Sequence, residues 1–285
     1  MKLDANDELR LFNDKYYNIP SLLELDLSQN GGLFDFAKIM EVFPSIKTLK
    51  LENGRLMNLD FQSDKINFRN LLVHNMEKFE SSDLQTIYSF EGLEFLKVTQ
   101  SNISEFVLPP EESRIQFLSL EGNEIKEISS DISKELTILN LSDNPLKSFN
   151  SSLKVDTVLL NNCELSEFPG IKANKIDITN NNIQLMSKDY DYSSLKYLRI
   201  EGNPLACDCR ALEFQEWLVS DREKFADQIE NALDYDCGGK KLSQVDLVDI
   251  CSTTTSKMPE PKTASSKGFT TKIFPFLAFI VLVMN

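Results

Sequence analysis

Apolar side chains recur along the chain in a short alternating pattern that repeats at a regular interval. In LTILNLSDNPL, which runs from Leu136 to Leu146, apolar residues at the first and fourth positions are followed by one at the sixth, an Asn at the ninth and a Leu at the eleventh. Seven further stretches share this register, starting at Leu22, Ile46, Leu93, Ile115, Val155, Ala173 and Leu195, and a weaker one starts at Phe68. Alternation with a period of two predicts a short strand with its apolar residues on one face.

The shared pattern, L-x-x-L-x-L-x-x-N-x-L with a step of roughly 18–25 residues, is the signature of the leucine-rich repeat. One unit cannot bury its apolar face alone, so stacked units supply the core. The expected fold is α/β: a horseshoe-shaped solenoid with a curved parallel sheet, an irregular or 3-10 convex side and inward Leu139, Leu141 and Leu146. Asn residues at the ninth position are expected to form a ladder, whose rungs are Asn30, Asn123, Asn144, Asn181 and Asn203. Cys163 falls on the same rung, and we interpret it as a buried ladder residue rather than as a reactive thiol.

The chain begins with what resembles the second half of a repeat, because Leu3, Asn6 and Leu9 have the spacing of Leu27, Asn30 and Leu33. A solenoid needs a polar terminal cap, and this start shows neither a cap nor a secretory signal peptide. We therefore expect preceding residues, a signal among them, to be missing. The alternative is a genuine short form with a frayed first unit.

Four cysteines follow the last repeat, and the first two lie in the stretch NPLACDCRALEFQEWL. Spacing alone leaves open a zinc site, a redox pair or a disulfide framework with three possible pairings; the split second pair and the absence of a nearby His disfavour zinc. The stretch resembles the cysteine-rich C-terminal cap of extracellular leucine-rich-repeat proteins, with Phe214 one residue early against the commonest form. The matching residues are Asn203, Pro204, Cys207, Cys209, Leu212, Phe214, Trp217 and Leu218, with Cys237 and Cys251 completing the four. This resemblance implies the pairs Cys207–Cys237 and Cys209–Cys251, and a helix that carries Leu212, Trp217 and Leu218 over the open end of the stack.

Paired cysteines indicate an oxidising compartment, and three N-glycosylation sequons, at Asn102, Asn140 and Asn150, agree with secretion. After the repeats (residues 1–205) and the cap (206–252), residues 253–268 are expected to be a disordered polar stalk. Residues 269–285 form the last segment, and its apolar run, which begins at Ile273, is too short to span a membrane comfortably. Small residues before this tail predict a GPI-attachment signal, with Ser266 as the expected anchor site and Ala264 as the other candidate. A short membrane span and a cryptic apolar tail are the alternatives.

Composition narrows the possible functions. A formal net charge of -14 argues against nucleic-acid binding, which needs a basic surface. The sequence carries no catalytic motif, and its single His, His74, is interpreted as an ordinary surface residue. We therefore expect a binding protein without catalytic, cofactor or metal residues.

Stacked strands place the residues between the inward positions on the concave face, in two columns. The first column is Glu24, Thr48, Asn70, Phe95, Phe117, Ile138, Thr157, Lys175 and Tyr197; the second is Asp26, Lys50, Leu72, Lys97, Ser119, Asn140, Leu159, Asp177 and Arg199. Exposed apolar residues rimmed by polar ones mark interaction sites. The predicted partner-binding residues are Lys50, Leu72, Phe95, Lys97, Phe117, Ile138, Tyr197 and Arg199.

The whole pattern resembles cell-surface proteins of the chaoptin and connectin kind, and more loosely the Toll, Slit and Trk ectodomains. This resemblance implies a protein ligand or self-association, and a role in cell adhesion or recognition on the outer side of the plasma membrane. An innate-immune recognition protein and an intracellular scaffold are the alternatives.

Overall fold

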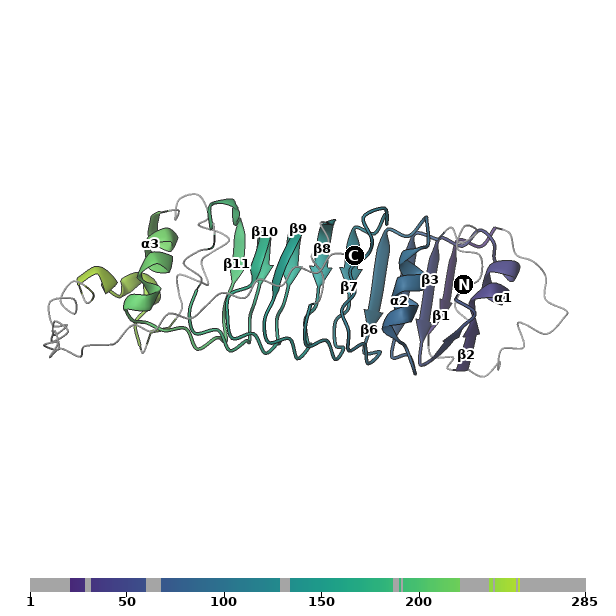
Figure 1. Cartoon of the computed structure of the whole chain (residues 1–285), viewed down its shortest axis with the longest axis horizontal. Helices are drawn as coiled ribbons and strands as arrows, with labels where there is room; N and C mark the ends of the chain where they lie inside the picture. Colours follow the sequence, from purple (N-terminus) through teal and green to yellow (C-terminus); the bar gives the residue numbers. More distant parts are fainter. Residues whose placement is uncertain are drawn as a thin grey trace, which may run out of the picture.

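The computed structural model describes residues 21–28, 32–59, 68–128, 134–186, 190, 192–220, 236–237, 239–249 and 251. Within this part of the chain each repeat contributes one strand to a nine-stranded parallel sheet, and the strands stack along the long axis of the molecule (Figure 1). In spatial order, which is also chain order, they are β1 (Glu24–Leu27), β3 (Thr48–Glu52), β5 (Asn70–His74), β6 (Phe95–Thr99), β7 (Phe117–Ser119), β8 (Glu135–Asn140), β9 (Asn150–Leu159), β10 (Gly170–Asp177) and β11 (Tyr197–Arg199). The predicted parallel-sheet solenoid is confirmed, and the weak repeat at Phe68 is a full member of it.

The register of the sheet reproduces both predicted columns. Glu24 pairs with Thr48, and the same column continues strand by strand through Phe95 and Phe117 to Tyr197. The second column runs in the same way from Asp26 to Arg199. Because side chains alternate along a strand, the residues of both columns share the face of the sheet that points away from the core.

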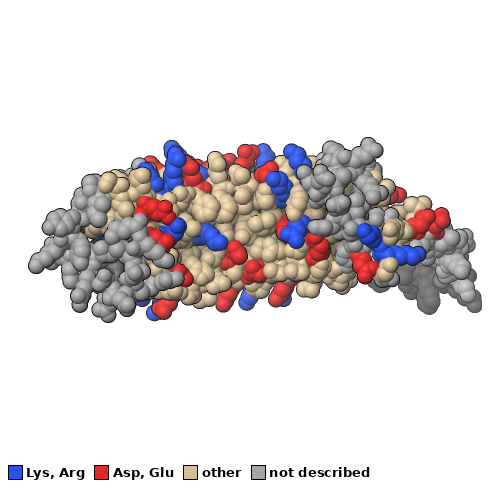
Figure 2. All heavy atoms as spheres, turned by 180° about the vertical axis from the view of Figure 1, so that it is seen from behind, with Lys and Arg blue, Asp and Glu red and all other residues tan. Residues whose placement is uncertain are grey.

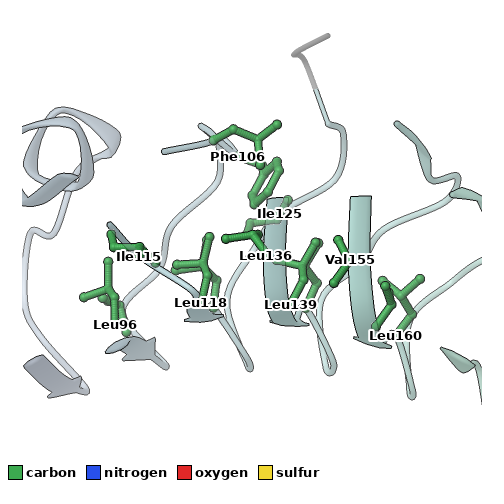
Figure 3. Close-up of a cluster of buried hydrophobic side chains, with 14 of the residues drawn as sticks. Leu96, Phe106, Ile115, Leu118, Ile125, Leu136, Leu139, Val155 and Leu160 are labelled. Atoms are coloured by element: carbon green, nitrogen blue, oxygen red, sulfur yellow. The ribbon is translucent and has the colours of Figure 1, made fainter. Parts of the chain in front are cut away.

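The residues between these columns fill the interior of the stack. Leu139, Leu141 and Leu146 are all 0% exposed, as the repeat pattern predicts. Figure 3 shows how equivalent residues of successive repeats, such as Leu96, Leu118 and Leu139, follow one another through the core. The apolar face of each repeat is thus buried by its neighbours.

Asparagine rungs close the turns that follow the strands. Asn123, Asn144, Asn181 and Asn203 are each at most 5% exposed. The Asn144 amide donates to the carbonyls of Leu120 and Leu141 at 2.9 Å each, and its Oδ1 accepts from the backbone N of Ile125 at 3.0 Å. One side chain therefore satisfies backbone groups of two adjacent repeats. Asn30 lies outside the described residues.

Cys163 holds the rung between Asn144 and Asn181 and is 6% exposed. Its thiol donates to the Leu141 carbonyl at 3.4 Å. Unlike asparagine, however, it has no amide oxygen that could accept a hydrogen bond from a backbone N–H of the preceding repeat. There the backbone N of Leu146 donates instead to the carbonyl of Asn144 at 2.8 Å. Burial raises the pKa of the Cys163 thiol to about 11. Its environment is that of the buried ladder residue predicted from the repeat pattern.

The side of the stack opposite the sheet is irregular over most of its length, but the first repeats carry regular elements that the sequence pattern did not predict. They are α1 (Phe36–Val42), α2 (Ser81–Tyr88) and a small parallel sheet of β2 (Gly32–Asp35) and β4 (Gly54–Met57).

Repeat length explains where the two helices form. The steps from Glu24 to Thr48 and from Asn70 to Phe95, which contain α1 and α2, are 24 and 25 residues long. The step from Ile138 to Thr157 is only 19 residues, and a return of that length has no room for a comparable helix. An N-terminal cap also stabilises α1, because the Asp35 side chain accepts a hydrogen bond from the backbone N of Lys38 at the start of the helix.

The C-terminal end of the described stack is covered by η4 (Cys209–Ala211), α3 (Leu212–Ser220) and η5 (Leu242–Gln244). Disulfides join Cys207 to Cys237 and Cys209 to Cys251, the pairs that the resemblance implies, with Cα–Cα distances of 5.5 and 5.4 Å. Phe214, at 4% exposure, is the most buried apolar residue described on α3. Its ring and that of Trp217 pack on Tyr192 at centroid distances of 5.8 and 4.8 Å. The cap thus continues the core; Leu212 packs partly buried against it, and the side chain of Leu218 lies outside the described part.

Candidate functional site

A hollow of about 420 Å³ opens on the outward face of the sheet across β3, β5 and β6. Lys50, Leu72 and Lys97, which are consecutive members of the second column, lie side by side along it. Further lining residues are Ser28, Leu51, Glu52, Val73, His74, Thr99, Gln100, Glu121, Gly122 and Asp143. Leu72 gives the hollow an apolar middle, and the two lysines place a cation on each side of it.

Acidic neighbours hold both of these lysines. Lys50 Nζ lies 2.6 Å from Glu24 Oε1, and this hydrogen bond raises the pKa of Lys50 above its ordinary value. Lys97 Nζ lies 3.7 Å from Glu121 Oε2. Figure 2 shows Lys and Arg side chains (blue) beside Asp and Glu side chains (red), with uncharged surface (tan) between these charged groups. Since exposed ion pairs are weak, a ligand can exchange with either carboxylate.

His74 belongs to a third column, one alternating position further along the strands than the second. It lies between Glu52 and Thr99 in the register, and its Nδ1 is 2.8 Å from the Thr99 hydroxyl oxygen. The imidazole is half-buried and lines the hollow. Its place on the sheet face follows from the strand alternation, whereas its contact with Thr99 depends on the neighbouring repeat.

An apolar strip, formed by Phe95, Phe117 and Ile138, continues from the hollow along the first column. The rings of Phe95 and Phe117 stack with centroids 4.0 Å apart and planes 8° from parallel. All three side chains are half-buried, rather than fully exposed as expected, because they pack on one another across the strands. Stacked aromatic rings on an outward face provide a rigid apolar contact surface.

The other two predicted partner-binding residues lie elsewhere. Tyr197 and Arg199 are on β11, and four strands separate them from Lys97 on β6. Arg199 is engaged by Asp177 at 3.4 Å and by Glu201 at 3.8 Å. The structure therefore gathers six of the eight residues and leaves these two at the far end of the sheet. The two predicted columns do not include the lining residues His74, Thr99 and Glu121, because these residues occupy the next outward position after the second column.

The three sequons have different surroundings. Asn102 and Asn150 are exposed. Asn140 lies on the sheet face, where its amide donates to Glu121 Oε2 at 3.2 Å and its Oδ1 accepts from the backbone N of Ser142 at 3.0 Å. Ser266 and the whole tail, residues 252–285, lie outside the described residues.

Two other kinds of site are absent from the described part of the chain. It contains no group of three or more His, Cys, Asp or Glu side chains arranged to hold a metal ion. None of its helices has both the length and the apolar character needed to cross a bilayer.

Stacked coils, one parallel strand per repeat and a ladder of buried asparagines together define the architecture. The protein has a leucine-rich-repeat fold. The repeats lie between β1 and β11, and the disulfide-linked segment follows them.

Comparison with known proteins gives distant relatives. No family model matches the chain. Toll-like receptor 2 of Macaca mulatta is 26% identical over 222 residues, and that of Homo sapiens is 24% identical over 222 residues; each alignment covers 72% of this chain and 26% of the receptor. The chain thus spans about a quarter of the length of these relatives. A solved structure of a leucine-rich-repeat protein from Leptospira interrogans superposes with a TM-score of 0.48 and 18% identity, over 70% of this chain and 59% of that one.

Proposed function

We propose that this protein is a ligand-binding ectodomain that acts at the outer surface of the cell and binds a protein partner through the outward face of its sheet. The observation that carries the proposal is the apolar strip beside the hollow, because such patches rimmed by polar groups mark interaction sites. Aromatic anchors contribute strongly to binding when they are packed and held in place, and the stacked pair Phe95 and Phe117 fits this description.

Independent features support the proposed location at the outer surface of the cell. Two disulfides in the cap are expected to persist only in an oxidising environment. The exposed sequons at Asn102 and Asn150 agree with passage through a secretory pathway. The distant relatives carry the name of a receptor, which is compatible with an extracellular ligand-binding role. We further propose, from the sequence of residues 253–285 alone, a stalk and a GPI tether attached at Ser266.

The role that we favour at the cell surface is adhesion or recognition. Beads coated with the full chain test self-association, and staining of cells with a tagged chain tests binding to a different partner. We expect Phe117→Ala to weaken either interaction about tenfold or more, because the substitution removes half of the aromatic pair. Leu185→Ala is the matched control, since Leu185 is 40% exposed and lies outside the sheet strands. Equal binding by both variants would refute the role of the sheet face.

The alternatives predict different results in the same assays. Selective binding to a microbial glycolipid, without binding to cells or to coated beads, would support innate-immune recognition instead of adhesion. Retention inside the cell, with unglycosylated Asn102 and Asn150 and reduced cysteines, would support an intracellular scaffold. Release of glycosylated protein from intact cells by phosphatidylinositol-specific phospholipase C tests the tether, and resistance to the enzyme would contradict it.

A further inference from the structure

Three donor groups meet at one point of the sheet face. Lys97, Ser119 and Asn140 are register partners on β6, β7 and β8. Glu121 Oε2 lies 3.2 Å from Asn140 Nδ2 and 3.7 Å from Lys97 Nζ. Because Lys97 and Asn140 flank Ser119 on the neighbouring strands, a carboxylate held by both of them spans the position of Ser119.

Ser119 is the unusual member of this group. It belongs to an outward column, yet it is only 1% exposed, and within the described residues its Oγ has no hydrogen-bond partner. Buried hydroxyls nearly always have a partner, and leaving one unpaired costs free energy. The group is therefore an ammonium, an amide N–H and a hydroxyl, all of which can donate to an anion, and only two of them contact the carboxylate that is present.

We propose that Glu121 fills a receptor site for an acidic side chain of the protein partner, and that the partner's carboxylate takes its place. The inference rests on the proposed function and names the chemistry of the ligand at that face. Exchange of one carboxylate for another keeps Lys97 and Asn140 paired, and it gives Ser119 the acceptor that it lacks. Phe117 lies two residues before Ser119 on the same face of β7, so the acidic residue of the partner is expected to have an apolar neighbour.

A small carboxylate tests the site without knowledge of the partner. In the full chain carrying Glu121→Ala, propionate should bind in the vacated position, as followed by NMR of the lysine signals during a titration. We expect the affinity for propionate to be at least tenfold higher in Glu121→Ala than in the unmodified chain, and at least tenfold lower again when Lys97→Met is added. Glu112→Ala, which removes an exposed carboxylate elsewhere, should leave propionate binding at the level of the unmodified chain.

Ser119 gives a second readout that a purely structural role would not produce. Adding Ser119→Ala to Glu121→Ala should weaken propionate binding severalfold, while in the unmodified background the same substitution should not lower stability. If Glu121→Ala does not fold, Glu121→Gln keeps the shape and weakens the bridge to Lys97, so it should still bind propionate more tightly than the unmodified chain. Propionate binding that is unchanged on removal of Glu121, or that survives the loss of Lys97, would overturn the inference.

The partner assays separate this inference from the proposed function. Lys97→Met should weaken partner binding about tenfold. If Phe117→Ala weakens partner binding and Lys97→Met does not, the acidic-ligand inference fails and the proposed function stands. If the unmodified chain binds neither coated beads nor cells, the proposed function fails, while the propionate titration still decides whether the carboxylate site exists.

Discussion

Substitution of one ladder residue, Asn144→Ala, tests how the stack is held together. The side chain is 2% exposed and makes three well-formed hydrogen bonds, two from its amide to the carbonyls of Leu120 and Leu141 and one from the backbone N of Ile125 to its Oδ1. At a net worth of roughly 1 kcal/mol each, these bonds contribute about 3 kcal/mol. The orphaned N–H of Ile125 adds roughly 1–2 kcal/mol, because a buried donor without a partner keeps its desolvation penalty.

We therefore expect Asn144→Ala to lower the free energy of unfolding by about 4–5 kcal/mol. Urea unfolding followed by circular dichroism measures this loss. Asn182→Ala is the matched control, because Asn182 is exposed; a surface substitution of this kind changes stability by about 0.5 kcal/mol or less. A loss in Asn144→Ala no larger than that of the control would refute the view that the rung amides hold adjacent repeats together.

Three further changes have expected outcomes. Gly202→Ala should destabilise the fold more than Gly239→Ala, and thermal melts of the two variants measure the difference. Both glycines have positive φ (73° and 94°), but an added Cβ would clash with Asn180 Oδ1 at Gly202, whereas at Gly239 it would meet no atom of the described residues within 4 Å. Double serine substitution of the Cys207–Cys237 disulfide, which closes a separation of 30 residues, should cost about 3–4 kcal/mol in urea unfolding, and an unchanged midpoint would contradict this. Burial raises the Cys163 pKa from 9.0 to about 11, so the unfolded chain loses the proton first and stability should fall as pH rises from about 9 to about 11, an effect absent in Cys163→Ala.

The repeated part of the fold follows from the sequence because one local rule applies in every unit. Alternation fixes which side chains point inward, and a constant offset from strand to turn fixes the register, so Glu24 and Tyr197 could be placed in one column across nine strands. The buried rungs follow from the same offset. These assignments need no knowledge of tertiary contacts, since the strand of each repeat pairs with its neighbours in the same register.

The details of the candidate site depend on pairs of repeats and could not be predicted in this way. Ser119 is buried although it belongs to an outward column. Glu121 contacts Lys97 and Asn140 from the two neighbouring repeats, and no pattern within one repeat encodes such contacts. Likewise, the stacking of Phe95 on Phe117 is decided by side-chain torsions across two strands. The sequence identified the face of the sheet, but not which of its residues are already engaged.

The position of the hollow along the stack has a physical basis. It lies where the repeats are least uniform: the rung positions corresponding to Asn123 are occupied there by Met76 and Ser101, and the returns are long enough for α1 and α2. The turns are satisfied by other means, since the hydroxyl of Ser101 accepts from the backbone N of Met76 at 3.1 Å. Departures from a local rule are expected at functional sites. The hollow therefore lies in the less regular first half of the stack, whereas the apolar strip continues from it into the repeats whose buried rungs are Asn123 and Asn144. The partner that we propose would contact both parts of the sheet face.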